Sequence, residues 1–202
     1  MNDIFRIHKL ALSFDKQVTN VEGEGLYRSV LETPAGDIVE VGSASGGSTV
    51  YLIEAALKVN KKVWSVDPYP ESYEDKALYY SPGITSLLKN SFEKNILKKY
   101  PEIVVVQIID FLENCIDKLP RSLSVVFIDS CHEFNLVKKE FDLLYPRVVS
   151  GGVILIHDVR WRKVGQLSNS LEGSVTNMIN YCSSLTGLQV SYIGKNLLKV
   201  LL

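Results

Sequence analysis

The sequence has few cysteines and no arrangement of them that suggests a structural role. Its three cysteines are an odd number at irregular spacing, and no two of them form a C-x-x-C pair. This usage indicates neither a disulfide framework nor a zinc cluster. It is typical of a protein kept in a reducing compartment, so we expect a cytoplasmic location.

Long apolar runs and blocks of basic residues are also absent. No segment has the roughly 18 apolar residues that a bilayer-spanning helix needs, and the start, MNDIFRIHKLALSF, lacks the uncharged apolar core of a signal peptide. The formal net charge is -1, with no long basic block. We therefore expect neither a membrane nor a nucleic acid as the main partner, and a small neutral or acidic molecule fits better.

The chain also has no internal repeat, low-complexity tract or interdomain linker. Its 202 residues, 46% of them hydrophobic, are enough to bury one substantial core, which predicts a single domain. Within it, residues 1–34 have apolar residues at helical spacing and are expected to form an N-terminal helical cap on the main domain, residues 35–202. The cap could cover a site or form the contact of a homodimer, and the sequence does not choose between these.

Short Val/Ile-rich runs alternate with amphipathic stretches along the main domain. Runs of this kind are typical of strands buried in a parallel sheet, and repeated strand–helix units predict a doubly wound α/β fold. Near the end, LQVSYIG and NLLKVLL are separated by Gly194-Lys195, which predicts a terminal hairpin. The expected parallel strands are residues 37–41, 62–66, 103–108, 124–128 and 153–156.

The run IVEVGSASGGST, residues 38–49, predicts a strand, a glycine-rich turn and the start of a helix. Gly42 can adopt backbone angles denied to other residues and lets the chain approach a ligand, while Gly46 and Gly47 leave amides free at the helix start. About 20 residues later, Asp67 ends the next apolar run and can accept both hydroxyls of a ribose. Together these features predict a site for an adenosine-type cofactor.

The glycine spacing is G-x-x-x-G-G, which differs from the dinucleotide fingerprint G-x-G-x-x-G. Glu40 would repel a pyrophosphate, but it could hold an ammonium beside a positively charged ligand. The E-x-G-x-x-x-G run resembles the first motif of class I S-adenosylmethionine-dependent methyltransferases. That resemblance implies S-adenosylmethionine as the cofactor and a Rossmann-like, mainly parallel seven-stranded sheet with a C-terminal antiparallel hairpin strand. The expected cofactor-binding residues are Glu40, Gly42, Ser43, Gly46, Ser48, Asp67, Asp110, Phe111 and Asp129.

Asp110 and Phe111 follow the third expected strand, where class I methyltransferases bind adenine. The resemblance implies that Asp110 accepts the adenine amino group and that Phe111 lies against the base. The residues alone leave another interpretation open, in which Asp110 caps a helix and Phe111 packs in the core.

The second half of the chain carries a longer pattern, VVFIDSCHEFNLVKKEFDLLYPRVVSGGVILIHDV, residues 125–159. It resembles I-D-G-x-H-x-Y, a helix and G-G-x-x-x-x-H-D, found in small-molecule O-methyltransferases related to macrolide-sugar methyltransferases and cephalosporin-hydroxylase-type proteins. Ser130 and Phe134 depart from this pattern. The resemblance implies methylation of a hydroxyl on a sugar or secondary metabolite. The positions that match are Asp129, His132, Gly151, Gly152, His157 and Asp158.

Methyl transfer to a hydroxyl needs a nucleophile that is positioned close to the methyl carbon and deprotonated. His132 is the candidate general base, since an imidazole can take the proton at neutral pH. Asp129 and Asp158 are the other candidate catalytic residues, because they could hold magnesium or another divalent cation that lowers the pKa of the hydroxyl. His157 is a third candidate ligand, although imidazole suits magnesium poorly. A polar turn residue is the alternative for His132, and a buried structural residue for His157.

Two other function classes stay open. An NAD-dependent oxidoreductase could use a similar sheet, but the pyrophosphate fingerprint and any Y-x-x-x-K sequence are missing from the chain. A non-catalytic S-adenosylmethionine-binding protein would have no need of Asp129, His132 and Asp158. The segment PYPESYEDKALYYSP, residues 68–82, follows the ribose-type acid directly and is a candidate substrate lid.

Overall fold

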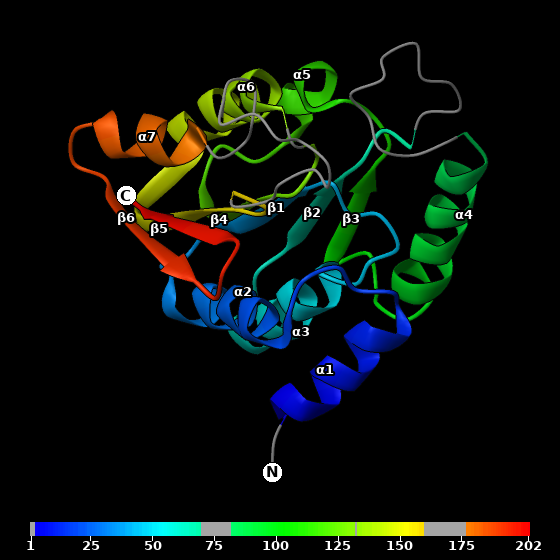
Figure 1. Cartoon of the computed structure of the whole chain (residues 1–202). Coiled ribbons are helices and arrows are strands. Elements are labelled where there is room, and N and C mark those ends of the chain that lie inside the picture. The colour runs from blue at the N-terminus through cyan, green and yellow to red at the C-terminus, as the bar shows by residue number, and fades with distance from the viewer. Residues whose placement is uncertain (1–2, 70–81, 132, 160–176) are drawn as a thin grey trace.

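The computed structural model describes residues 3–69, 82–131, 133–159 and 177–202. Within them the chain forms one seven-stranded sheet in the order β3-β2-β1-β4-β5-β7-β6, with helices on both faces (Figure 1). The strands are β1 (Asp37–Val41), β2 (Val63–Val66), β3 (Val105–Ile108), β4 (Leu123–Ile128), β5 (Val148–Ile156), β6 (Gln189–Ile193) and β7 (Leu197–Leu201).

The helices connect these strands and cover the sheet. Short π or 3-10 segments follow three of them: η1 (Glu93–Leu97), η2 (Ile116–Lys118) and η3 (Tyr145–Arg147). The α-helices are α1 (Asp3–Ser13), α2 (Asn20–Glu32), α3 (Thr49–Val59), α4 (Pro82–Phe92), α5 (Leu112–Cys115), α6 (Phe134–Leu144) and α7 (Asn177–Ser184).

The strand pairing confirms the Rossmann-like α/β fold that the sequence predicts. Strands β1 to β5 pair in parallel, while β7 pairs antiparallel with both β5 and β6. The predicted C-terminal hairpin is therefore the antiparallel end of the sheet. The carboxyl ends of the parallel strands all open on one edge, so residues that follow these strands are brought together there.

Strand β5 begins at Val148, five residues before the predicted start at 153. Its pairing with β4 shifts register between Leu123 and Val125, and Gly151 within it has a φ of +79°. A side chain on Gly152 would lie 2.8 Å from the carbonyl oxygen of Val149 and 3.0 Å from that of Ser124. The two glycines therefore let the strand continue through an irregularity that the apolar pattern alone does not reveal.

Strand β4 lies at the centre and divides the core into two layers. All six of its residues are buried. Val125 and Phe127 face the layer that contains α1, α2 and α3, while Val126 and Ile128 face the layer that contains α5, α6 and α7. Figure 1 shows α2 and α3 on one side of the sheet and α5, α6 and α7 on the other. Burial on both faces explains why the strands are nearly continuous in Val and Ile.

The N-terminal helices share their core with α3. Ile7 and Ala11 of α1 and Leu26 and Val30 of α2 are fully buried in the same cluster as the apolar side of α3. Helix α2 starts with a capping box, in which Thr19 and Glu22 bond to each other's backbone.

Among the described residues, no helix combines the length and the apolar character that a membrane span requires. Most of the candidate lid, residues 70–81, lies outside the described residues, and so does His132.

Candidate active site

The glycine-rich turn after β1 lies directly against the loop after β4. Gly42 has a φ of +88°, and a side chain there would lie 2.3 Å from the carbonyl oxygen of Asp129. Its amide donates to the Val66 carbonyl at 2.9 Å, and the amide of Gly46 closes the turn by donating to the Ser43 carbonyl at 2.9 Å. Glycine at position 42 thus lets the carboxyl ends of β1, β2 and β4 lie close together.

Glu40 ties the end of β1 to the start of α3. Its side chain is fully buried, and its two oxygens accept hydrogen bonds from Ser48 Oγ and Thr49 Oγ1, each at 2.6 Å. Burial raises the pKa of this carboxyl to about 8, against the lowering effect of the two hydroxyls. A cation placed beside Glu40 would favour the ionised form, so the residue is suited to an ammonium group.

Asp67 holds the glycine-rich turn from the side of β2. Its Oδ2 accepts the amides of Ser43 at 3.0 Å and Ala44 at 2.9 Å, and its Oδ1 accepts the amide of Tyr69 at 3.1 Å. Burial raises the pKa of Asp67, although these backbone donors oppose the change. Since a carboxylate oxygen can accept two hydrogen bonds, Oδ1 has capacity for a further donor such as a hydroxyl. The Ser43 hydroxyl also contacts that of Ser65 below it.

Asp110 and Phe111 form a turn at the start of α5. Asp110 Oδ1 accepts the amide of Phe111 at 2.9 Å and the side-chain amide of Asn114 at 3.0 Å. The Phe111 side chain is 42% exposed, so it is not the core residue of the alternative interpretation. Asp110 shapes this turn, but α5 has no side-chain cap hydrogen bond, so the helix-cap alternative is not what the structure shows. The Phe111 ring lies outside the core and presents a flat apolar surface.

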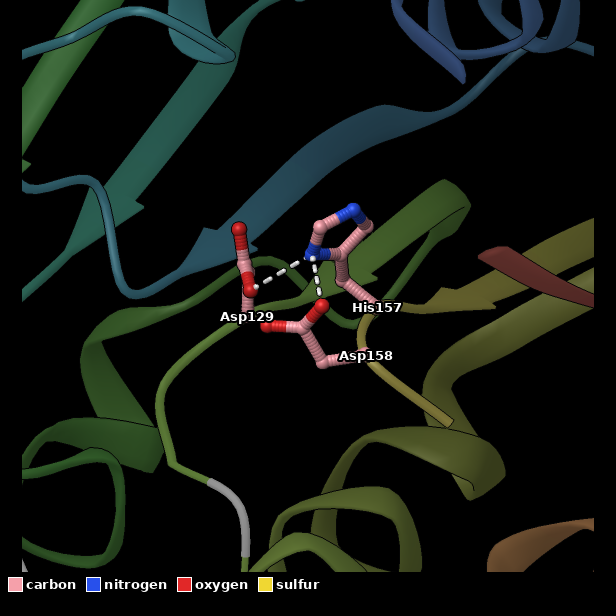
Figure 2. A group of neighbouring side chains, drawn as sticks. All are labelled: Asp129, His157 and Asp158. Atoms are coloured by element: carbon pink, nitrogen blue, oxygen red, sulfur yellow. Dashed lines mark ion pairs between the residues drawn. The ribbon is translucent and has the colours of Figure 1, made fainter. Parts of the chain in front are cut away.

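Asp129, His157 and Asp158 meet at the ends of β4 and β5 (Figure 2). Backbone hydrogen bonds set their positions, because the Asp129 amide donates to Val41 at 2.8 Å and the His157 amide donates to Ile128 at 3.0 Å. His157 Nδ1 lies 3.2 Å from Asp129 Oδ1 and 3.4 Å from Asp158 Oδ1. The imidazole therefore faces both carboxylates through one nitrogen.

The other nitrogen of His157 faces a residue far away in the sequence. Nε2 lies 3.5 Å from Glu22 Oε2, and the two side chains are 3% and 1% exposed. Burial by itself lowers the pKa of His157, but Asp129, Asp158 and Glu22 together raise it well above the ordinary value. Glu22 was not predicted as a site residue. Its only sequence signal, T-x-x-E before an apolar stretch, predicts a helix start.

The donor atoms of this group fit a divalent cation. One ligand atom each from Asp129, His157 and Asp158 lies within 4.8 Å of the others. Among the described residues neither ring nitrogen of His157 has a partner with good hydrogen-bond geometry, although both face carboxylates. A cation could take the place of a proton on Nδ1. Two carboxylates and an imidazole suit a transition metal such as Mn²⁺ better than Mg²⁺.

A family model for a methyltransferase domain matches residues 39–159. The chain belongs to this methyltransferase family. The match begins within β1 and ends directly after Asp158, so it includes the glycine-rich turn, Asp67 and the group around His157. It confirms the methyltransferase expectation.

Among curated proteins, an uncharacterized protein of Acanthamoeba polyphaga mimivirus is 27% identical to this methyltransferase chain over 133 residues. The alignment covers 61% of the chain and 52% of that relative. The chain therefore spans about half the length of the curated relative it matches.

Solved structures share the fold of this methyltransferase chain over nearly its whole length. A protein from Corynebacterium glutamicum has a TM-score of 0.69 at 17% identity, with 98% of this chain and 88% of that one covered. An O-methyltransferase from Bacillus cereus in complex with SAH has a TM-score of 0.67 at 13% identity, covering 98% and 89%. The O-methyltransferase TomG from Streptomyces achromogenes, in complex with SAM, has a TM-score of 0.63 at 14% identity, covering 99% and 89%.

The expected residues of the methyltransferase site fall into three groups in the structure. One lies in and around the glycine-rich turn, a second is the Asp110–Phe111 turn, and a third is the group around His157, which includes Asp129 and Asp158, two of the residues predicted to be catalytic. The predicted base, His132, lies outside the described residues. The turn group consists of Glu40, Gly42, Ser43, Gly46, Ser48 and Asp67.

Proposed function

We propose that the chain is an S-adenosylmethionine-dependent methyltransferase that acts on a hydroxyl oxygen of a small molecule. The observation that carries this proposal is the contact of two sites at one sheet edge. The glycine-rich turn, held by Glu40 and Asp67, lies against the backbone of Asp129, which also belongs to the group around His157. A cofactor in the turn would therefore have its reactive end close to these acids.

The residues of the turn suit the separate parts of the cofactor. Glu40 is a buried carboxyl whose ionised form an ammonium would stabilise, as the amino group of the methionine part requires. Asp67 Oδ1 has acceptor capacity for a ribose hydroxyl. Phe111 offers an exposed ring against which adenine can stack, next to the Asp110 carboxylate. The three groups thus offer partners for the amino group, the ribose and the adenine of the cofactor.

The reaction is an in-line displacement. The acceptor oxygen forms a bond to the methyl carbon while the bond from that carbon to the sulfonium sulfur breaks, so its electron pair stays on sulfur and the products are S-adenosylhomocysteine and a methyl ether. The hydroxyl proton must pass to a base, and His132 is our candidate. Asp129, Asp158 and His157 Nδ1 would hold a divalent cation, which when bound lowers the pKa of a hydroxyl beside it.

Calorimetric titration with S-adenosylhomocysteine, repeated with NADH, tests the cofactor class. We expect micromolar binding of S-adenosylhomocysteine, about -8 kcal/mol, and no binding of NADH. Binding of NADH alone would contradict the proposal, and so would binding of neither. Once the cofactor class is established, a screen of sugars and phenols with labelled S-adenosylmethionine, with and without Mg²⁺ or Mn²⁺, would identify the acceptor and the need for a metal.

A further inference from the structure

We propose that Glu22, in the N-terminal helix α2, is a positioning residue that fixes the His157 ring so that Nδ1 faces Asp129 and Asp158. The inference rests on the proposed function, since it assigns this ring to the reaction centre. It gives the N-terminal segment a direct connection to that centre, which neither the sequence pattern nor the family match supplies; the match begins at residue 39.

The Glu22 carboxylate receives contacts from three separate parts of the chain. Oε2 accepts the Thr19 amide at 2.9 Å and the Thr19 hydroxyl at 2.7 Å. Oε1 accepts the Asn196 amide, in the turn between β6 and β7, at 3.1 Å. Oε2 also lies 3.5 Å from His157 Nε2. Both oxygens of this buried carboxyl therefore accept hydrogen bonds from other parts of the chain, and one of them also faces the imidazole.

A helix cap alone does not explain this burial. A capping-box glutamate needs only the amide of the cap residue, and it can make that bond at the protein surface. Glu22 is instead 1% exposed, in a place where an ionised carboxylate is tolerated only if it is well paired. The Asn196 amide in the β6–β7 turn and the His157 imidazole supply the additional partners that the capping box does not provide. The location of the carboxylate beside His157 is therefore the feature that requires an explanation.

The contacts on the two ring nitrogens select one orientation of the imidazole. Nε2 faces Glu22, while Nδ1 faces Asp129 and Asp158. Turning the ring by half a revolution would put carbon atoms against the carboxylates on both sides and lose all three ion pairs. A carboxylate behind an imidazole also orients histidine ligands in metal sites, where the other nitrogen is then directed at the cation. Glu22 would serve this purpose whether or not a cation is bound.

The test compares Glu22→Gln with Lys61→Met. Glutamine keeps the shape of the side chain but removes the charge that attracts the proton on Nε2. Lys61 Nζ donates to the carbonyls of Val30 and Thr33, each at 3.0 Å, at the far end of α2. Its replacement weakens the same helix without touching His157. Thermal unfolding would verify that both variants are folded.

The readout is the long-range ¹H–¹⁵N spectrum of the histidine rings, with His157 assigned by its loss in His157→Gln. In the wild type we expect a slowly exchanging proton on Nε2. In Glu22→Gln this proton signal should move upfield and exchange faster, because a charge-assisted contact is lost. Lys61→Met should leave it unchanged. The proposal is overturned if the wild type has no protected Nε2 proton, if Glu22→Gln leaves the signal unchanged, or if both variants change it equally.

Titration of the same samples with S-adenosylhomocysteine separates this inference from the proposed function. If the protein does not bind S-adenosylhomocysteine but the His157 ring responds to Glu22→Gln, the proposed function fails. The contact between Glu22 and His157 is then established, but it has no role in catalysis, so the positioning role is overturned as well. If the protein binds S-adenosylhomocysteine and the ring does not respond, only the inference about Glu22 fails.

Discussion

Asp67 shows how one side chain can both build a site and take part in it. Its carboxylate accepts three backbone amides, two of them from the glycine-rich turn. We expect Asp67→Ala to weaken binding of S-adenosylhomocysteine by about 2 to 3 kcal/mol, because a hydrogen bond to a charged acceptor contributes about 1.5 to 3 kcal/mol and the turn also loses the contacts of its amides with Asp67. Calorimetric titration of both proteins would measure the difference.

Asp37→Ala is the matched control for this substitution. Asp37 accepts the indole N–H of Trp64 at 3.0 Å and lies at the amino end of β1, away from the site. The control should lower stability and leave the affinity for S-adenosylhomocysteine within about twofold of the wild type. An equal loss of affinity in the two variants would mean that Asp67 acts only through stability.

The buried carboxyl of Glu140 should make the stability of the fold depend on pH. Burial raises its pKa to about 7, while the Ser130 hydroxyl, at 2.5 Å, opposes this change. In the unfolded chain the pKa of Glu140 is near its ordinary value, about 4.3. Folding therefore favours the protonated carboxyl, and the free energy of unfolding falls as the pH rises from about 4.3 to about 7. Glu140→Gln should therefore be more stable than the wild type by about 1 to 3 kcal/mol above pH 7.

Below about pH 4 that advantage of Glu140→Gln should disappear, since the wild-type carboxyl is then protonated in both states. Urea unfolding at pH 4 and pH 8 would measure it. A difference between the two proteins that does not change with pH would show that Glu140 has no raised pKa. In the I-D-G-x-H pattern that residues 128–132 resemble, glycine stands at the position of Ser130 and has no hydroxyl to bond to Glu140.

At the scale of elements, the attachment of α3 to β1 depends on the hydroxyls that bond to Glu40. Thr49→Val removes the hydroxyl that donates to Glu40 Oε2. The fully buried carboxyl then keeps only one of its two hydroxyl donors, Ser48. We expect the free energy of unfolding to fall by about 1 to 3 kcal/mol, as when a buried polar group loses its partner. Urea denaturation would measure the loss.

Thr49→Ser is the conservative control, because it keeps the hydroxyl and removes only a methyl group. It should retain more of the stability than Thr49→Val. Equal losses in the two variants would assign the effect to packing at the start of α3, and the contact with Glu40 would then contribute little.

The elements themselves were largely predictable from local patterns. Val/Ile runs located the parallel strands because most residues of the central strands are buried on both faces of the sheet, and Gly194 located the hairpin. The early start of β5 was missed because it depends on pairing with Leu123 across the sheet and on the two glycines at 151 and 152. Such pairing depends on residues that are distant in the sequence, so the local pattern of apolar residues does not predict it.

At the scale of the whole molecule, the sequence predicted the sheet edge at which the site lies, because residues that end parallel strands must meet there. It did not predict that Glu22 would reach the same edge. An amphipathic helix such as α2 can cover any apolar face, and its position follows from packing against α3 and the β6–β7 hairpin. The Thr19–Glu22 capping box is legible in the sequence, but its proximity to His157 exists only in the folded chain.

Cofactor binding should stabilise the molecule as a unit, because the glycine-rich turn, Asp67 and the loop after β4 come from three strands of one sheet. At 100 times its dissociation constant, S-adenosylhomocysteine should add about 2.7 kcal/mol to the free energy of unfolding. For a chain of this size that corresponds to a rise in melting temperature of about 5 to 10 °C, measured by calorimetry or circular dichroism. At the same ligand concentration Asp67→Ala should lose most of the rise, while Asp37→Ala should keep it. Stabilisation by NADH instead would contradict the site described above.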